Sequence, residues 1–274
     1  MIAPMLIDTH CHLDAAEFDA DRDLVAGQAL QKGLCAIVVP AVARNNFDSV
    51  IDLCARHQHC AYALGIHPMY VESSALQDLE VLEQYVAKYQ PVAIGEIGLD
   101  YFLTNPRSNP DNIARQTNFF IAQLKIARQT QLPVILHVRN AIDDVLKQLR
   151  KYQVAGGIAH AFNGSFQQAQ QFIDLGFKLG FGGAMTYDRA LKIRELAAKL
   201  PLEAIVLETD APDIPPEWVG GNARNSPLEL PKIAEVLADL KQVNVSQVID
   251  ITSGNAIKIL PKIADLCTRV KVAL

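Results

Sequence analysis

The sequence lacks the cysteine pattern of a disulfide-rich protein or a zinc ribbon. Its five cysteines, Cys11, Cys35, Cys54, Cys60 and Cys267, are odd in number and include no C-x-x-C pair. It also lacks an N-terminal charged segment followed by a long apolar run, and no apolar run approaches the roughly 18 residues that span a bilayer. We therefore expect a cytoplasmic protein in a reducing compartment, with no membrane partner.

Excess positive charge is missing as well. The formal net charge of −5 argues against a broad basic face for gripping duplex nucleic acid, although a local site could take its positive charge from bound metal. The sequence contains no G-x-G-x-x-G, no G-x-x-x-x-G-K-[ST] and no G-x-S-x-G motif, which excludes the usual nucleotide-cofactor loops and the serine nucleophile elbow. With 50% hydrophobic and 20% charged residues, the composition is that of a globular protein, and we expect one domain over residues 1–274.

Short apolar runs alternate with longer amphipathic stretches along the chain. The predicted strands are residues 5–10, 35–41, 61–66, 92–98, 133–138, 156–161, 177–183 and 204–210. Helical spacing is clear over residues 22–33 and 114–130, residues 104–112 form a predicted loop, and residues 226–274 are expected to form two helices. Eight strand and helix units in a chain of this length favour a (β/α)₈ TIM barrel, with an open doubly wound sheet as the alternative.

Six residues with metal-binding side chains end these apolar runs. They are His10, His12, Glu96, His137, His160 and Asp210. All lie at the carboxyl ends of predicted strands, the end that carries the active site in a barrel. A single histidine in such a place is more often an ordinary hydrogen-bonded residue, but six at the same end of five strands favour a metal centre.

Nitrogen and oxygen ligands of this kind suit Zn²⁺, Mn²⁺ or Mg²⁺. Six ligands exceed the need of one catalytic ion and suit two divalent metal ions bridged by Glu96. Two such ions would polarise a phosphoryl oxygen and generate a hydroxide near neutral pH. Asp210 is then a ligand, a general base for the attacking water, or both.

For other polar residues near the carboxyl ends of the predicted strands, the sequence allows two interpretations each. His67 and Arg139 are candidate phosphate contacts, with a loop histidine and a surface ion pair as the alternatives. Arg224 is a weaker candidate of the same kind. Asp100 either lines the mouth of the barrel or starts a helix. Buried carboxylates just inside the barrel, Asp8 and Glu208, are expected to support the histidines through hydrogen bonds.

Taken together, these motifs resemble the TatD family of metal-dependent hydrolases. The matching segments are DTHCHLD (8–14), GIHP (65–68), GEIGLDY (95–101), PVILHVRNA (133–141), AHAFNGS (159–165), LETDAP (207–212) and ARNSP (223–227). The resemblance implies a TIM barrel of the amidohydrolase-like type, divalent metals and phosphodiesterase activity on DNA. It also implies that the same six residues are metal ligands and that His67 and Arg139 contact substrate. This chain departs from the family in having HVRNA, HAFNG and LETDAP where members commonly show serine, aspartate or cysteine variants, so its substrate preference is open.

Three functions follow from these features. The first is a deoxyribonuclease or related phosphodiesterase acting on DNA or oligonucleotides, with short or single-stranded ends favoured because few surface cations are available. The second is an amidase, lactonase or deaminase acting on a small anionic substrate. The third is a non-catalytic, metal-stabilised binding module, which the acid, base and anion-binding groups at the mouth argue against. No obligate protein partner is indicated.

Overall fold

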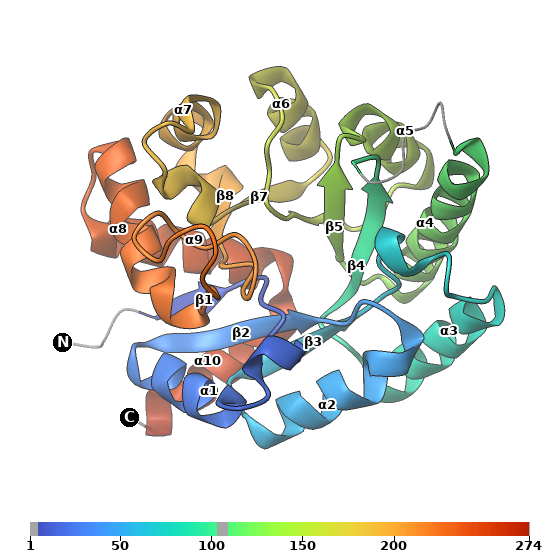
Figure 1. Ribbon diagram of the computed structural model, residues 1–274, viewed down its shortest axis with the longest axis horizontal. Helices are drawn as coiled ribbons and strands as arrows, with labels where there is room; N and C mark the ends of the chain where they lie inside the picture. The colour runs from blue at the N-terminus through green and yellow to red at the C-terminus, as the bar shows by residue number, and fades with distance from the viewer. Residues whose placement is uncertain (1–4, 103–108, 274) are drawn as a thin grey trace.

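The computed structural model describes residues 5–102 and 109–273, which contain an eight-stranded parallel sheet with its strands in chain order (Figure 1). Each strand pairs in parallel with the next one along the chain. The strands are β1 (Leu6–Asp8), β2 (Leu34–Pro40), β3 (Cys60–Leu64), β4 (Ala93–Asp100), β5 (Val134–Arg139), β6 (Gly157–Ala159), β7 (Phe177–Phe181) and β8 (Ile205–Leu207). All eight coincide with a predicted apolar run.

Hydrogen bonds between the first and last strand segments bring the sheet to near closure. The backbone N–H of Thr9 donates to the carbonyl of Leu207 at 3.1 Å, and the N–H of Asp210 donates to the carbonyl of His10 at 2.8 Å. The Thr9 hydroxyl donates to the same Leu207 carbonyl at 3.0 Å. An open sheet would keep its edge strands apart, so the barrel prediction is confirmed and the doubly wound alternative is excluded.

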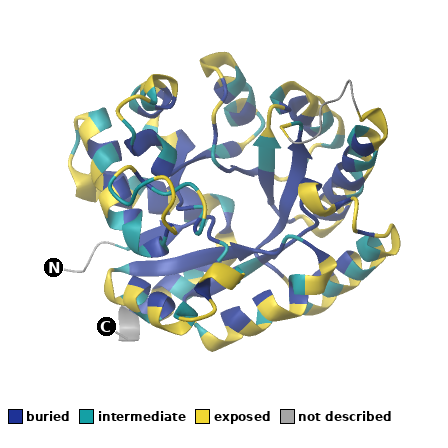
Figure 2. Ribbon diagram, viewed as in Figure 1, coloured by how far each residue is buried: buried dark blue, intermediate teal, exposed yellow. Residues whose placement is uncertain are grey.

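Helices surround the barrel, with buried faces towards the strands and exposed faces outwards (Figure 2). They are α1 (Arg22–Gln31), α2 (Phe47–Arg56), α3 (Gln77–Tyr89), α4 (Pro110–Thr130), α5 (Ile142–Tyr152), α6 (Phe166–Asp174), α7 (Leu191–Lys199), α8 (Leu230–Lys241), α9 (Val245–Ile259) and α10 (Ala264–Ala273). In α2, for example, Phe47, Val50 and Leu53 are buried at helical spacing. Strands β2 and β4, for example, are buried on both faces along their whole length, as near-continuous apolar runs require.

Helix α4 begins earlier than its apolar spacing predicts. Residues 104–108 of the predicted loop lie outside the described residues, but 110–112 belong to the helix and not to a loop. The side chain of Asn109 accepts a hydrogen bond from the N–H of Asn112 at 3.1 Å, and Pro110 occupies the first helical position. Both features stabilise a helix start, and they outweigh the polar composition that suggested a loop.

The C-terminal segment forms three helices, so the prediction of two helices over residues 226–274 is wrong. Helix α9 ends at Ile259 because Leu260 precedes a proline and leaves the helical region, with φ −120° and ψ 67°. After Pro261 the chain turns and begins α10.

This last turn and α10 cover the amino end of the barrel. Leu260 and Ile263 are fully buried in one cluster with Ile7 and Val206 from the barrel interior. The carboxyl ends of the strands lie at the opposite end. No helix in the described part of the chain combines the length and the apolar character that crossing a bilayer needs.

Candidate metal centre

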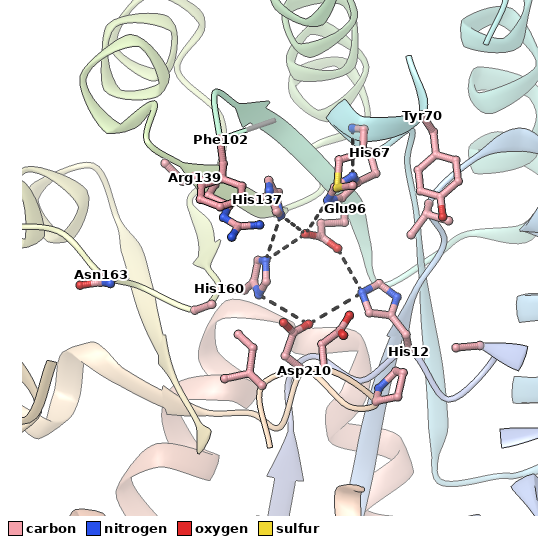
Figure 3. A pocket seen from close by; sticks show the side chains of 18 of the residues that line it. His12, His67, Tyr70, Glu96, Phe102, His137, Arg139, His160, Asn163 and Asp210 are labelled. Carbon is pink, nitrogen blue, oxygen red and sulfur yellow. Dashed lines mark hydrogen bonds and ion pairs between the residues drawn. The ribbon is translucent and has the colours of Figure 1, made fainter. Parts of the chain in front are cut away.

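The six predicted ligands lie together at the carboxyl end of the barrel, and Figure 3 shows His12, Glu96, His137, His160 and Asp210 around the pocket. His10 and His12 follow β1, Glu96 lies in β4, His137 lies in β5, His160 follows β6 and Asp210 follows β8. Five of them line a pocket of about 1060 Å³, and His10 lies beneath it with 0% exposure. The structure therefore brings the whole set into one site, and the role of its members as ligands remains a prediction.

One carboxylate oxygen of Glu96 faces the two histidines that follow β1. Its Oε2 lies 3.1 Å from Nε2 of His10 and 3.3 Å from Nε2 of His12, and these two nitrogens are 3.2 Å apart. Oδ1 of Asp210 lies 3.4 Å from the same nitrogen of His10. Among the described residues Oε2 receives no well-directed hydrogen bond. Nitrogens and oxygens that converge on one point in this way fit a divalent cation such as Zn²⁺ or Mn²⁺.

The other oxygen of Glu96 faces a second set of imidazole nitrogens. Oε1 lies 2.8 Å from Nδ1 of His137, 2.9 Å from Nε2 of His160 and 3.3 Å from Nε2 of His67. Figure 3 shows contacts from the carboxylate to His12 on one side and to His137 and His160 on the other. The two oxygens of one buried side chain therefore serve two separate groups of ligand atoms.

Strand β4 is irregular where it presents Glu96. Ile94 pairs with Val134 but Ile97 pairs with Leu136, so three steps along β4 match two along β5. This is a local bulge, a feature that redirects a side chain. Gly95 allows the close approach of the two strands here, because a Cβ at that position would lie 2.7 Å from Cβ of Ile135.

The negative charge of the Glu96 carboxylate favours positive charge on the imidazoles around it. Burial opposes ionisation of Glu96, but the imidazoles of His67, His160 and His10 hold its pKa well below the ordinary value. Burial likewise opposes protonation of His160, yet Glu96 and Asp210 raise its pKa to about 10. The site therefore stabilises positive charge at this point, and a divalent cation supplies such charge without protons.

Asp100 holds the ring of His137. Its Oδ2 lies 2.9 Å from Nε2 of His137, and its Oδ1 accepts a hydrogen bond from the N–H of Phe102 at 2.8 Å. Gln116 fixes the backbone of Asp100 from both sides, accepting from its N–H at 2.9 Å and donating to its carbonyl at 3.1 Å. With a proton on Nε2 the neutral ring of His137 keeps its lone pair on Nδ1, the atom that faces Glu96.

The sequence left Asp100 with two possible places, the mouth of the barrel or a helix start. A clue to its contact with the centre was present, because Asp100 follows Glu96 by four residues in one strand. An even spacing puts both side chains on the same face.

His67 lies close to Glu96 but presents a hydrogen atom, not a lone pair. Its Nδ1 accepts a hydrogen bond from the N–H of Met69 at 3.1 Å, which places the proton of the neutral ring on Nε2. Burial, the largest effect, lowers its pKa to about 4, so the ring is neutral at pH 7. Distance alone groups His67 with Glu96 and His137, but a protonated nitrogen donates and does not ligate.

Two further carboxylates, Asp8 and Glu208, are buried at the carboxyl ends of β1 and β8. Oδ1 of Asp8 accepts from the backbone N–H of His10 at 3.2 Å and from that of Thr209 at 3.0 Å, so it supports the backbone and not the imidazole. Glu208 accepts from the N–H of Ala161, and its Oε1 is 3.9 Å from Nδ1 of His160. Burial is the main reason that the pKa of Asp8 rises to about 7 and that of Glu208 to about 8.

The two candidate arginines lie in different places. Arg139 is exposed at the end of β5, lines the pocket, and places its guanidinium carbon 3.6 Å from the centroid of the Phe102 ring. Arg224 donates to both carboxylate oxygens of Asp21 at 2.7 Å and does not line the pocket. Arg224 is therefore part of a surface ion pair and lies apart from the candidate phosphate contacts.

Comparisons with known proteins show the family and the fold of this chain. Residues 7–261 match the model of the TatD related DNase family. YjjV of Escherichia coli strain K12, named an uncharacterized metal-dependent hydrolase, is 38% identical over 252 residues, which cover 91% of this chain and 95% of YjjV. The crystal structure of YjjV superposes with a TM-score of 0.88 over 95% of this chain and 99% of that chain.

Human deoxyribonuclease TATDN3 is 31% identical over 272 residues, which cover 95% of this chain and 96% of TATDN3. An organophosphorus hydrolase from Deinococcus radiodurans is 14% identical with a TM-score of 0.62, over 94% of this chain and 94% of that chain, and shows a likeness of fold alone.

Proposed function

The chain belongs to the TatD family of metal-dependent hydrolases, and from this premise we propose that it hydrolyses phosphodiester bonds in DNA with two divalent metal ions. The name of human TATDN3, a deoxyribonuclease related over nearly the whole chain, supports the choice of bond. The proposal treats residues 1–274 as one catalytic domain that needs no protein partner.

The observation that carries the proposal is the position of the Glu96 carboxylate. Its Oε2 faces His10 and His12, and its Oε1 faces His137 and His160. A carboxylate with a separate set of nitrogens at each oxygen suits a bridge between two cations. Paired cations are a common solution for displacement at phosphorus, because both the attacking and the leaving oxygen need stabilisation.

The candidate ligands fall into two groups that would hold one cation each. His10, His12 and Asp210 would hold one, His137 and His160 would hold the other, and Glu96 would contribute to both. The donors suit Zn²⁺, Mn²⁺ or Mg²⁺, which when bound polarise a phosphoryl oxygen and lower the pKa of water.

The remaining groups of the pocket would accept the proton of the attacking water and bind the negative charge of the phosphate. Burial is the largest effect on Asp210 and raises its pKa, which suits a carboxylate that accepts the proton of the attacking water. His67 lines the pocket with its Nε2–H 3.3 Å from Oε1 of Glu96, and it would donate to a phosphate oxygen bound beside that carboxylate. Arg139 would bind a second phosphate oxygen, because its planar guanidinium matches phosphate geometry.

Short or single-stranded DNA is the substrate class that the charges favour. Among the described residues that line the pocket, Arg139 is the one lysine or arginine. A duplex bound along its backbone is normally neutralised by many cations, which the net charge of −5 does not supply.

The test is cleavage of an end-labelled single-stranded oligonucleotide by protein whose metal content has been measured. We expect two metal ions per chain, cleavage that chelation abolishes, and a loss of kcat of at least about 100-fold in Glu96→Gln and Asp210→Asn. Glu80→Gln, an exposed glutamate in α3, is the matched control and should behave as wild type.

Two outcomes would overturn the proposal. Equal cleavage by wild type, Glu96→Gln and Asp210→Asn would mean a contaminant or a wrong site. No cleavage by protein that holds both ions, with hydrolysis of a small carboxylate-bearing amide or lactone, would favour the small-molecule amidase, lactonase or deaminase. Arg139 and His67 could bind a carboxylate as well as a phosphate.

A further inference from the structure

Two exposed aromatic rings stand at the rim of the pocket. Phe102, which follows β4, is 55% exposed, and Tyr70, which lies in the turn after β3, is 43% exposed. Both line the pocket, and Figure 3 shows them along the rim on the side of Glu96 that carries His67 and His137. Large apolar rings of the described residues are mostly buried, so exposed rings beside a catalytic pocket indicate a binding surface.

Two contacts position Phe102. Its backbone N–H donates to Oδ1 of the buried Asp100 at 2.8 Å, and the guanidinium carbon of Arg139 lies over one face of its ring, 3.6 Å from the ring centroid. A flat ring with a cation on it, beside a pocket built for a phosphate, matches the two parts of a nucleotide: a flat base and an anionic group. Aromatic side chains that take stacked bases next to basic groups are typical of single-strand binding.

The charges around the pocket are uneven. Acidic residues Asp14, Glu17 and Asp213 lie on the loops that follow β1 and β8, across the centre from Phe102 and Arg139. Phosphates of a bound strand would be repelled by these acids and attracted by Arg139. The strand is therefore directed over the aromatic side of the rim.

We propose that Phe102, with Arg139 stacked on it, and Tyr70 form a binding site for unpaired bases of a single-stranded nucleic-acid end, beside the phosphate that the metal centre cleaves. The proposal rests on the proposed phosphodiesterase function and adds what holds the strand. A base that is paired and stacked in a duplex cannot present its face to these rings, so the site selects frayed or single-stranded ends.

The first experiment measures stacking without cleavage. Single-stranded oligonucleotides carrying 2-aminopurine at the 3′ or the 5′ end are bound to the metal-loaded Asp210→Asn variant, and fluorescence quenching reports a stacked terminal base. We expect quenching for at least one of the two, its loss when Phe102→Leu is added, and its retention with Phe102→Tyr. Leucine keeps an apolar support under Arg139 but removes the flat ring, and Tyr70→Leu tests the second ring in the same way.

The second experiment compares an intact oligonucleotide with one whose terminal nucleotide is abasic, using metal-loaded wild type. We expect a KM about tenfold lower for the intact oligonucleotide, the effect of one base–aromatic stack, and loss of this difference in Phe102→Leu. The matched control is Phe166→Leu, an exposed phenylalanine in α6 with Lys199 over its ring, away from the pocket. It should keep the wild-type difference.

The outcomes separate the two proposals. Absence of quenching with both oligonucleotides, or equal quenching in the Leu and Tyr variants of Phe102, overturns the base-binding site whatever the enzyme cleaves. Equal KM values for intact and abasic substrate in wild type do the same. Quenching that depends on Phe102 without any cleavage by wild type supports the base site and overturns the phosphodiesterase.

Discussion

Gly180 in β7 makes room for the buried carboxylate of Glu208, and this can be tested by adding one carbon atom. A Cβ at position 180 would lie 2.1 Å from Oε2, 2.5 Å from Cδ and 2.7 Å from Oε1 of Glu208. Ordinary contact begins near 3.4 Å. In Gly180→Ala the carboxylate must therefore move by more than about 1 Å, although it is 1% exposed and has packed atoms around it.

That movement has two costs. It breaks the hydrogen bond from the N–H of Ala161 to Glu208, which leaves buried polar groups unpaired at about 1–3 kcal/mol. Forcing an extra carbon into a packed interior costs about 1–3 kcal/mol more. We expect Gly180→Ala to lower the free energy of unfolding by about 2–6 kcal/mol, a large part of the about 5–15 kcal/mol that holds a typical domain together.

Urea unfolding of the metal-free protein, monitored by circular dichroism, measures the loss of unfolding free energy caused by Gly180→Ala in the wild type and in Glu208→Ala. In Glu208→Ala the space next to position 180 is vacated, so adding Gly180→Ala should cost less than about 1 kcal/mol there. Gly254→Ala in α9 is the control, since nothing lies within 4 Å of its added Cβ, and it should gain about 0.5–1 kcal/mol. An equal cost of Gly180→Ala in both backgrounds would refute the clash with Glu208.

Two further predictions concern carboxylates near the centre. Asp100→Asn should weaken metal binding about 10–100-fold, because an amide has one acceptor oxygen where the carboxylate accepts from both the ring of His137 and the N–H of Phe102. A calorimetric titration with Mn²⁺ measures this, and an unchanged affinity would contradict the role of Asp100. Burial raises the pKa of Glu208 from 4.5 to about 8, so between these values the folded protein binds a proton that the unfolded chain releases. The free energy of unfolding of the metal-free protein should therefore fall as pH rises through this window, by up to about 5 kcal/mol, and Glu208→Gln should flatten the curve. Urea unfolding of wild type and Glu208→Gln at pH 5 and pH 8 measures this. An equal change in the free energy of unfolding with pH in the two proteins would contradict the role of Glu208.

The barrel could be predicted from sequence because its strands are buried on both faces. Strand β2 shows why: all of Leu34–Pro40 is buried, so the run is apolar without interruption and stands out from the amphipathic segments around it. The tail could not be predicted so well. Pro261 is a local signal for the end of α9, but whether a further helix follows it depends on the packing of α10 against the barrel, which no local pattern reports.

The candidate ligands could be predicted for a similar reason. A parallel barrel brings all carboxyl ends of its strands to one mouth, so position in the strand is enough to gather His10, Glu96 and Asp210. The position of a residue in its strand does not show which atom of its side chain faces which atom of a neighbouring side chain. The proton on Nε2 of His67 follows from a backbone N–H two residues later, and the ring of His137 is held by a residue from a neighbouring strand. Contacts of this kind depend on register and rotamer, which spacing does not give.

Asp100 joins the metal centre to the rim. One of its oxygens accepts from the ring of His137 and the other from the backbone of Phe102, and both bonds come from a single buried group. A shift of the Asp100 carboxylate would therefore change the orientation of the His137 ring and the position of Phe102 together. Metal affinity and base discrimination should therefore be coupled: a change at Asp100 should weaken both, whereas Phe102→Leu should alter the second without the first. The distance between base and cleaved phosphate is then set by one side chain and not by the independent positions of two loops.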